Sequence, residues 1–309
     1  MRKNGNLLGS LMLLLCAFIW GTSFVAQSEA MNSMGPLTFQ AARSFLGGAV
    51  LIPVIFCYSA VRKRRTADCK ETPEVKKKTL WVGVLCGIVL CTASLLQQYG
   101  IAMGTSGGKA GFITALYIIL VPIAGVLFFK KRVHPALWAC VGAAVVGLWL
   151  ICIKGDFTLE ISDLLVIGCS FVFCLHIILI DRFSPGLDGI KVSCIQFFTA
   201  AVISLIGALI FEKPEISHLT DGWFSLFYAG VLSSGVAYTL QILGQQRTEP
   251  TAASLLMSLE SVFAVVGTVG ISIISGEPQF PSLRETIGCL IMFGAIIAAQ
   301  LLPKVRERS

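Results

Sequence analysis

Long apolar runs separated by short polar connections dominate the 309-residue sequence. Each run is continuous and does not alternate apolar with polar residues, which favours helices over half-buried strands. A helix needs roughly 20 residues to cross the hydrocarbon core of a membrane, and ten runs approach that length. The sequence therefore predicts an all-α polytopic membrane protein with ten transmembrane helices, at about residues 7–26, 36–59, 79–102, 110–129, 135–153, 163–181, 189–211, 222–245, 251–275 and 283–303.

The composition agrees with this pattern. Charged residues make up 13% of the chain and hydrophobic residues 55%, whereas soluble globular proteins have ~25% charged residues. Such a chain cannot cover itself with a polar surface, so a soluble enzyme, a secreted disulfide scaffold and a nucleic-acid-binding protein are excluded. The continuous runs exclude a transmembrane barrel, whose strands alternate. The first run follows Arg2 and Lys3 as a signal peptide would, but its length is that of a transmembrane helix.

The basic residues are distributed unevenly among the predicted connections. If the N-terminus is cytoplasmic, 19 of the 24 lysines and arginines fall on the cytoplasmic side, four fall outside, and Arg43 lies within a span. Cytoplasmic connections are enriched in lysine and arginine, so we predict a multi-pass protein of the cell membrane with both termini in the cytoplasm. The basic connection at 60–78 has no interleaved aromatic residues. We interpret it as an anchor to anionic membrane lipid and expect no nucleic-acid partner.

No motif of a cofactor, a metal or an enzyme appears in the sequence. The eleven cysteines lie nearly all inside apolar runs, without a C-x-x-C pair or metal-ligand spacing, and we interpret them as small buried hydrophobic residues. A G-x-x-x-x-G-K-[ST] phosphate loop and an H-E-x-x-H motif are both absent. We therefore expect no cofactor, no metal and no enzyme activity, and a driving force that comes from a gradient.

The two halves of the chain resemble each other. Three colinear sets of matches, at offsets of 147, 156 and 143 residues, relate residues 1–155 to residues 156–309, and each half holds five predicted spans. Because five is odd, the second half would cross the membrane in the opposite orientation. Inverted repeats are typical of secondary transporters, whose substrate site lies near the midplane between the repeats. The matches include GTSFV at 21–25 with GCSFV at 168–172, Gln40 with Gln196, Gly87 with Gly230, Gln98 with Gln241 and Leu116 with Leu259.

Several segments resemble the EamA branch of the drug/metabolite transporter superfamily. They are Trp20-Gly21-Thr22-Ser23-Phe24-Val25, Arg43 in the second span, Gly104-Thr105-Ser106-Gly107-Gly108-Lys109-Ala110, and Leu259-Glu260-Ser261-Val262-Phe263-Ala264 in the ninth span. The last segment has Ser261 where the family has proline, so the resemblance carries no proline kink to this position. The resemblance covers essentially the whole chain. It implies a ten-helix secondary transporter, commonly an exporter of amino acids or related metabolites.

Two ionisable residues lie at membrane depth. Arg43 is about 10 Å inside the second span at ~1.5 Å per residue, where a charge costs at least ~2.5 kcal/mol and should face a cavity or a partner. It either captures an anionic substrate group through paired hydrogen bonds or acts as a structural clamp. Glu260 is near the middle of the ninth span. It either carries a coupling proton or meets a substrate ammonium, or it neutralises Arg43, or it is an acid satisfied by neutral partners.

Neutral polar residues add to these charges within the spans. The repeat relates Gln98 to Gln241 and Gln40 to Gln196, and such pairs are expected where two repeats line one cavity; their alternative role is hydrogen bonding between helices. Trp20 either stacks on a ligand or anchors the membrane interface. The candidate substrate-binding residues are therefore Arg43, Glu260, Gln40, Gln98, Gln196, Gln241, Tyr117, Tyr238 and Trp20, with Glu260 also the candidate coupling residue.

These observations favour a secondary-active transporter of small polar metabolites, an amino-acid or related metabolite exporter that works by alternating access. Its partners are a small-molecule substrate, a proton as coupling ion, and membrane lipid; the sequence does not define an oligomeric state. A drug or sugar-type carrier of the same superfamily is the alternative within transport. A non-transporting membrane sensor or scaffold is the alternative outside it, although the longest connection, at 60–78, is too short for a soluble output domain.

Overall fold

A computed structural model describes residues 2–65, 72–130, 134–153, 159–274 and 280–301, and within these ranges the chain is helical and has no strand. The prediction of an all-α protein is therefore confirmed. The elements are α1 (Arg2–Ala30), α2 (Pro36–Arg65), α3 (Pro73–Ala102), α4 (Gly107–Thr114), α5 (Tyr117–Phe129), α6 (Pro135–Cys152), α7 (Ile161–Phe183), α8 (Gly189–Phe211), α9 (Ile216–Asp221), α10 (Trp223–Phe227), the π-helix η1 (Tyr228–Tyr238), α11 (Thr239–Gln245), α12 (Pro250–Met257), α13 (Glu260–Ile274) and α14 (Leu283–Leu301).

Local sequence signals set where several helices begin. Pro36, Pro135 and Pro250 each occupy the first position of a helix, where the missing N–H costs nothing and the fixed φ suits the helix. The side chains of Ser106 and Asp188 accept hydrogen bonds from backbone N–H groups in the first turns of α4 and α8. These bonds satisfy donors that a helix start otherwise leaves free.

Nine helical segments in the described part of the chain are long and apolar enough to cross a membrane, so the protein is a multi-pass membrane protein. They correspond to the first nine predicted spans. The tenth predicted span coincides with α14, a 19-residue helix that is not among the nine, and the count of ten remains a prediction. The nine segments are Leu7–Phe24, Pro36–Ala60, Pro73–Ala102, Lys109–Phe129, Pro135–Cys152, Ile161–Phe183, Gly189–Phe211, Trp223–Gln245 and Pro250–Gly267.

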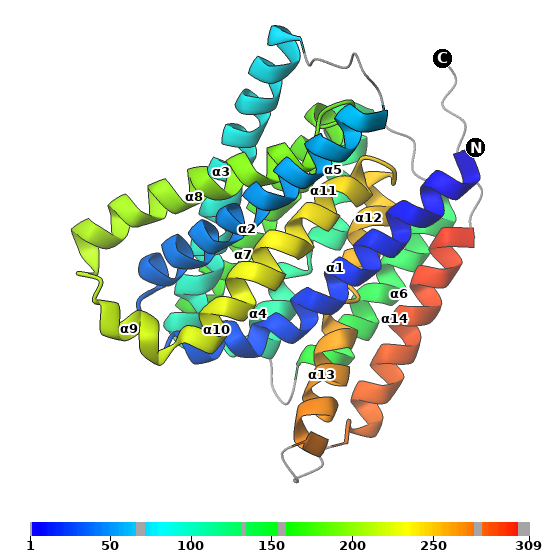
Figure 1. Ribbon diagram of the computed structural model, residues 1–309. Helices are drawn as coiled ribbons and strands as arrows, with labels where there is room; N and C mark the ends of the chain where they lie inside the picture. Colours follow the sequence, from blue (N-terminus) through cyan, green and yellow to red (C-terminus); the bar gives the residue numbers. More distant parts are fainter. Residues whose placement is uncertain (1, 66–71, 131–133, 154–158, 275–279, 302–309) are drawn as a thin grey trace.

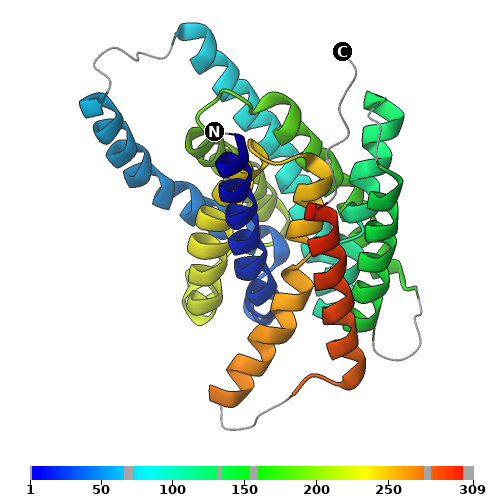
Figure 2. The same ribbon diagram turned by 90° about the vertical axis from the view of Figure 1, so that its right-hand side faces the viewer.

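The start of α1 and the end of α14 lie at the same end of the helix bundle (Figures 1 and 2). An even number of crossings would place them in this way. Six of the 19 basic residues predicted to be cytoplasmic fall in 66–71, 131–133 and 302–309, which lie outside the described residues.

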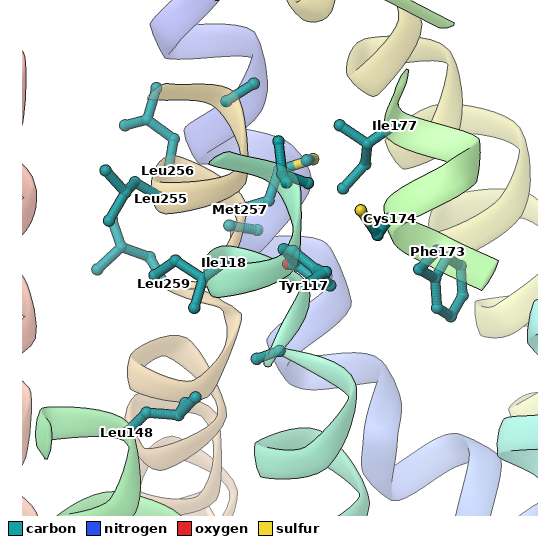
Figure 3. Packing of buried hydrophobic residues seen from close by; sticks show 14 of the residues in the cluster. Tyr117, Ile118, Leu148, Phe173, Cys174, Ile177, Leu255, Leu256, Met257 and Leu259 are labelled. Carbon is teal, nitrogen blue, oxygen red and sulfur yellow. The ribbon is translucent and has the colours of Figure 1, made fainter. Parts of the chain in front are cut away.

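The helices of the two sequence halves are interleaved. Helix α2 of the first half packs along α8 of the second half. Likewise α3 packs along α7 and α8, and α6 packs along α14. α1 likewise contacts η1, α11 and α13. The main buried cluster contains residues from both halves, and Figure 3 shows Tyr117 and Met257 opposite Phe173 and Ile177 of α7. A site between the halves is therefore enclosed by helices that are far apart in the sequence.

Two carboxylates of the second half bind residues at the starts of the first-half helices α4 and α2. The fully buried Asp163, in the first turn of α7, lies 2.5 Å from the Lys109 Nζ and accepts a hydrogen bond from the Thr105 hydroxyl at 2.9 Å. Glu212, which caps the end of α8, accepts backbone N–H bonds from Leu37 at 2.9 Å and Thr38 at 2.7 Å. A carboxylate at a helix N-terminus is favoured by the helix dipole, so Glu212 fixes the start of α2 against α8.

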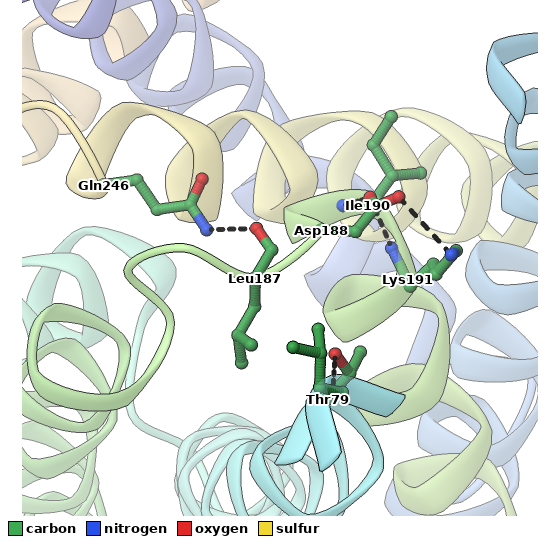
Figure 4. A network of polar contacts seen from close by, with 7 residues as sticks. Thr79, Leu187, Asp188, Ile190, Lys191 and Gln246 are labelled. Carbon is green, nitrogen blue, oxygen red and sulfur yellow. Dashed lines mark hydrogen bonds and ion pairs between the residues drawn. The ribbon is translucent and has the colours of Figure 1, made fainter. Parts of the chain in front are cut away.

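A further polar network joins the end of α11 to the connection between α7 and α8 (Figure 4). Gln246 donates hydrogen bonds from Nε2 to the carbonyl oxygens of Ser184, at 2.9 Å, and Leu187, at 3.2 Å. Asp188 accepts from the backbone N–H of Ile190 at 3.1 Å and lies 3.8 Å from the Lys191 ammonium. These bonds satisfy the carbonyls at the end of one helix and the N–H groups at the start of the next.

Candidate functional site

Two spans are interrupted near their middle. The span predicted at 110–129 consists of α4 and α5, and the span predicted at 251–275 contains α12 and α13. Both interruptions are tight turns: Leu116 N–H donates to the Ile113 carbonyl at 3.2 Å, and Leu259 N–H donates to the Leu256 carbonyl at 3.3 Å. The two breaks are 143 residues apart, which is one of the offsets of the sequence repeat. Short tight turns inside a helix often mark functional hinges.

Neither break is marked by proline or glycine in the sequence, because residues 115–116 and 258–259 contain neither. Ser261 replaces the proline of the family pattern, yet α12 ends at Met257 and α13 begins at Glu260. A break therefore occurs in the ninth span without a proline. At this break the Ser258 hydroxyl donates back to the Leu255 carbonyl at 2.8 Å, a type of bond that bends helices.

The breaks border a cavity between the two halves. The cavity is small in this structure, with a volume of about 40 Å³, below the roughly 300–1,000 Å³ of typical small-molecule sites. Seven of the fifteen lining residues are apolar or aromatic, and two of these, Tyr117 and Tyr238, also carry a hydroxyl group. The apolar and aromatic ones are Trp20, Phe24, Tyr117, Phe173, Ile177, Tyr238 and Met257; the others are Ser23, Gln27, Arg43, Gln97, Thr114, Ser233, Gln241 and Glu260.

Arg43 reaches the cavity from α2 and is 3% exposed. Its Nη1 donates a hydrogen bond to the Gln27 Oε1 at 3.2 Å, and its guanidinium carbon lies 5.5 Å from the centroid of the Phe39 ring. Its Nε has no hydrogen-bond partner among the described residues. Arg43 is a buried cation, and the hydrogen-bond acceptor described above for it is a neutral amide. Its charge is therefore not balanced by that contact, and an anionic ligand would balance the charge and accept from the remaining donors.

Glu260 is the first residue of α13 and is 4% exposed. Its Oε1 accepts a hydrogen bond from the Tyr117 hydroxyl at 3.4 Å. Tyr117 is the first residue of α5, so the first residues of the second half-helices, α5 and α13, meet across the cavity. Arg43 and Glu260 line the same cavity, but no ion pair joins them in the described part of the chain.

Trp20 and Tyr238 form an aromatic wall of the cavity. Their ring centroids are 4.6 Å apart, and the Trp20 indole N–H donates to the Ser233 carbonyl at 3.3 Å. Ser233 and Tyr238 both belong to η1, an eleven-residue π-helix. π-Helical geometry is rare and occurs frequently at functional sites.

Two glutamines complete the polar lining. Gln97 donates to the Thr114 hydroxyl at 2.9 Å, whereas the Gln241 Oε1 has no partner among the described residues. Six of the nine candidate residues from the sequence therefore line the cavity: Arg43, Glu260, Tyr117, Tyr238, Trp20 and Gln241.

The other three candidates are buried but are not part of the cavity lining. Gln40 donates to the Ser44 hydroxyl on its own helix at 3.2 Å. Gln98 donates to the Gln27 carbonyl at 3.3 Å, and the Gln196 Oε1 lies 3.3 Å from the His176 Nε2. Their contacts fit hydrogen bonding between and along helices, which was the alternative role considered for them.

Sequence reasoning missed several lining residues. Among them, Ser23 and Phe24 belong to the family motif, and Gln27 follows Trp20 by seven residues, so α1 places all of them on one side. That spacing was an available signal for Gln27. Phe173, Ile177 and Met257 look like ordinary core residues in the sequence, and no pattern distinguishes them.

The structure shows no obvious metal centre in the residues that it describes. No group of three or more histidine, cysteine, aspartate or glutamate residues is arranged there to hold an ion. The chemistry available in the cavity is therefore that of a buried guanidinium, a buried carboxyl group, amides, hydroxyls and aromatic faces.

Comparisons with known proteins support the family resemblance. Residues 7–153 and 160–299 each match the EamA-like transporter family. An uncharacterized transporter of Archaeoglobus fulgidus is 26% identical, covering 86% of this chain and 79% of that protein. The threonine/homoserine exporter RhtA of Escherichia coli is 29% identical over 58% of each chain. A crystal structure with 19% identity aligns at a TM-score of 0.72, covering 95% of this chain and 96% of the other, and shows the fold alone.

Proposed function

Because the chain belongs to the EamA-like transporter family, we propose that it is a secondary-active carrier of small polar metabolites, specifically an exporter of an amino acid or a related metabolite. In this proposal the carrier works by alternating access in the cell membrane. It has ten spans in two inverted five-span repeats, residues 1–155 and 156–309, and both termini are cytoplasmic.

The observation that carries the substrate class is the separation of the two charges. Arg43 and Glu260 line one cavity, and each has a neutral hydrogen-bond partner, Gln27 and Tyr117 respectively. An amino acid carries a carboxylate and an ammonium, which are the complements of these two groups. In the proposed complex Arg43 binds the carboxylate, Glu260 binds the ammonium or the coupling proton, and Tyr238 and Gln241 contact the remaining polar edges.

Two further observations support this assignment. The relative RhtA is a threonine/homoserine exporter, although it is only 29% identical and matches 58% of each chain. The family matches occur once in each half of the chain, and the helix breaks are separated by a repeat offset. Paired broken helices with a site between repeats are typical of secondary transporters that rock around a central site.

The proposal is tested by counterflow in proteoliposomes. Purified protein is preloaded with unlabelled metabolites from a panel of amino acids, sugars and cationic drugs, and the trapping of labelled compound is measured. Exchange of amino acids supports the proposed class, whereas exchange limited to sugars or drugs points to the alternative carrier classes. Absence of any exchange by folded protein would favour a non-transporting sensor or scaffold.

A pair of substitutions separates ligand binding from charge neutralisation. If Arg43 and Glu260 handle the substrate, the double variant Arg43→Gln with Glu260→Gln should fold and remain inactive in counterflow. If the two residues only neutralise each other, the double variant should recover transport that Arg43→Gln alone has lost. Recovery would contradict the site assignment.

The proposed orientation has its own test. Reporter fusions after Lys77 and after Arg247 should report a cytoplasmic location, and a fusion near Glu215 should report an external one. A cytoplasmic signal near Glu215 would contradict the inverted-repeat topology, because the second half would then have a different number of crossings.

A further inference from the structure

Gln27 contacts three elements of the cavity wall although no family motif of the sequence analysis includes it. From α1 its Oε1 accepts the hydrogen bond of Arg43 at 3.2 Å, and its carbonyl oxygen accepts one from Gln98 of α3 at 3.3 Å. Its Nε2 donates to the Ser23 hydroxyl at 3.3 Å. Gln27 is 5% exposed and lines the cavity itself. Its side chain is therefore fixed at both amide atoms, and it joins α1, α2 and α3.

This contact is one of several that hold Arg43, which also lies over the Phe39 ring and beside Tyr238. Nη1 is held by Gln27 while Nε, on the same rigid guanidinium plane, has no partner among the described residues. The opposite charge in the cavity, on Glu260, is engaged by Tyr117. One edge of the guanidinium is thus fixed by a neutral acceptor, and donor capacity remains for a ligand.

We propose that Gln27 is a positioning residue for substrate binding: it orients Arg43 with a neutral amide and thereby keeps the guanidinium available for the carboxylate of the transported molecule. This inference rests on the proposed function. An amide oxygen and a carboxylate oxygen have the same shape, but a carboxylate at this position would form a charge-assisted pair with Arg43. That internal pair would compete with the substrate for the same donors. The neutrality of residue 27 is therefore a condition for binding an anionic group.

The test is the isosteric substitution Gln27→Glu, with L-threonine as the first probe in counterflow. The KM for L-threonine should rise about tenfold or more, as expected from the loss of a charge-assisted contact, while the maximal exchange rate of folded protein changes little. The inhibition constant of 1-aminopropan-2-ol, which has the same amine and hydroxyl but no carboxylate, should stay the same or fall. A purely structural role of Gln27 would alter both constants alike.

A matched control separates the Arg43 contact from the added negative charge. Gln97 also lines the cavity, but it donates to the Thr114 hydroxyl. Gln97→Glu places the same charge in the same cavity, and it should change the KM for L-threonine less than Gln27→Glu does. An equal rise in the two variants would overturn the inference, because charge in the cavity would then explain the effect without Arg43.

Folding of the variant is checked by size-exclusion chromatography. If Gln27→Glu does not fold, Gln27→Asn and Gln27→Asp compare a neutral amide with a carboxylate at position 27 on a shorter side chain. The KM for L-threonine should then be lower in Gln27→Asn than in Gln27→Asp. A KM for L-threonine within about twofold of wild type in the charged variant overturns this inference only. If the wild-type protein exchanges no amino acid at all, both the proposed function and this inference are wrong.

Discussion

The two helix breaks share a backbone arrangement and differ in their chemistry. Each follows an eight-residue helix, α4 or α12, and each contains a two-residue turn closed by a bond from the second turn residue to the carbonyl three positions earlier. The next residue starts the second half-helix: it is Tyr117 in the first break and Glu260 in the second. One break therefore supplies a phenol and the other an acid, and the two side chains are hydrogen-bonded.

This difference shows how a repeated chain can build an asymmetric site. The backbone of each half breaks at an equivalent position, while the first residue after the break differs between the halves. We infer that the break at Glu260 carries the ion chemistry of the transport cycle and that the break at Tyr117 orients the acid. Four predictions test this contrast.

The largest expected effect is that of Glu260→Gln. Burial disfavours the charged form of a carboxyl group, so in the proposed alternating-access cycle Glu260 would take up and release a proton, and glutamine could not. Uptake driven by a pH gradient should be lost, while counterflow of substrate, which needs no net proton movement, should remain measurable. Full pH-driven uptake in this variant would mean that the acid is structural and that the carrier couples elsewhere or not at all.

The second prediction uses the repeat-related glycines of GTSFV and GCSFV. A Cβ on Gly21 would lie 2.3 Å from the Glu260 carbonyl oxygen, whereas a Cβ on Gly168 would meet only Leu96, at 3.7 Å. Gly21→Ala should therefore force α1 away from the second break and destabilise the protein by about 1–3 kcal/mol, the usual cost of overpacking. Gly168→Ala should be neutral or stabilising by up to ~1 kcal/mol, because alanine favours a helix.

Thermal unfolding of both glycine variants in detergent measures this difference. Gly168→Ala serves as the control for the substitution itself. Equal stability of the two variants would show that the contact between α1 and the second break is not tight in the protein.

A smaller effect is expected for Tyr117→Phe. The substitution removes the hydroxyl that donates to Glu260 but keeps the ring in its buried place. A hydrogen bond to an ionisable group contributes about 1.5–3 kcal/mol, and this one is long at 3.4 Å, so pH-driven uptake should fall by about three- to tenfold. Counterflow should change less. A complete loss of both activities would instead place Tyr117 in direct contact with the substrate.

The smallest effect is expected for Ser258→Ala, which makes the second turn resemble Ala115 of the first. Among the described residues, the Ser258 hydroxyl bonds to the Leu255 carbonyl of its own helix, so its loss should change stability by less than about 1 kcal/mol. Counterflow rates should stay close to those of wild type. A large loss of transport would show that the serine, and not the packing around the turn, maintains the break.

Much of the fold could be predicted because membrane helices leave a strong one-dimensional signal. The first nine predicted spans coincide with the nine apolar helical segments of the described chain, and Pro36, Pro135 and Pro250 begin helices, a position that suits proline. The breaks were missed because residues 115–116 and 258–259 contain neither proline nor glycine. Their apolar runs continue through the turns, and hydropathy does not register a change in hydrogen bonding.

The candidate site was predicted in part for a related reason. Arg43 and Glu260 could be identified because a charge within an apolar span needs a cavity or a partner. Amides are less costly there, so Gln40, Gln98 and Gln196 could not be distinguished from Gln241 by residue type. Gln27 lies near the end of the first span, where a polar residue is ordinary, and only its contact with Arg43 marks it.

The sequence by itself determined that the chain is a helical membrane protein of the EamA-like transporter family with two related halves, because span length, hydropathy and motifs are local properties. Tertiary structure decided which polar residues meet. In a membrane, lipid is as apolar as the protein interior, so helix faces are selected by close packing and not by hydrophobic contrast. The meeting of Tyr117 with Glu260 and of Gln27 with Arg43 depends on that packing, and no pattern along the chain specifies it.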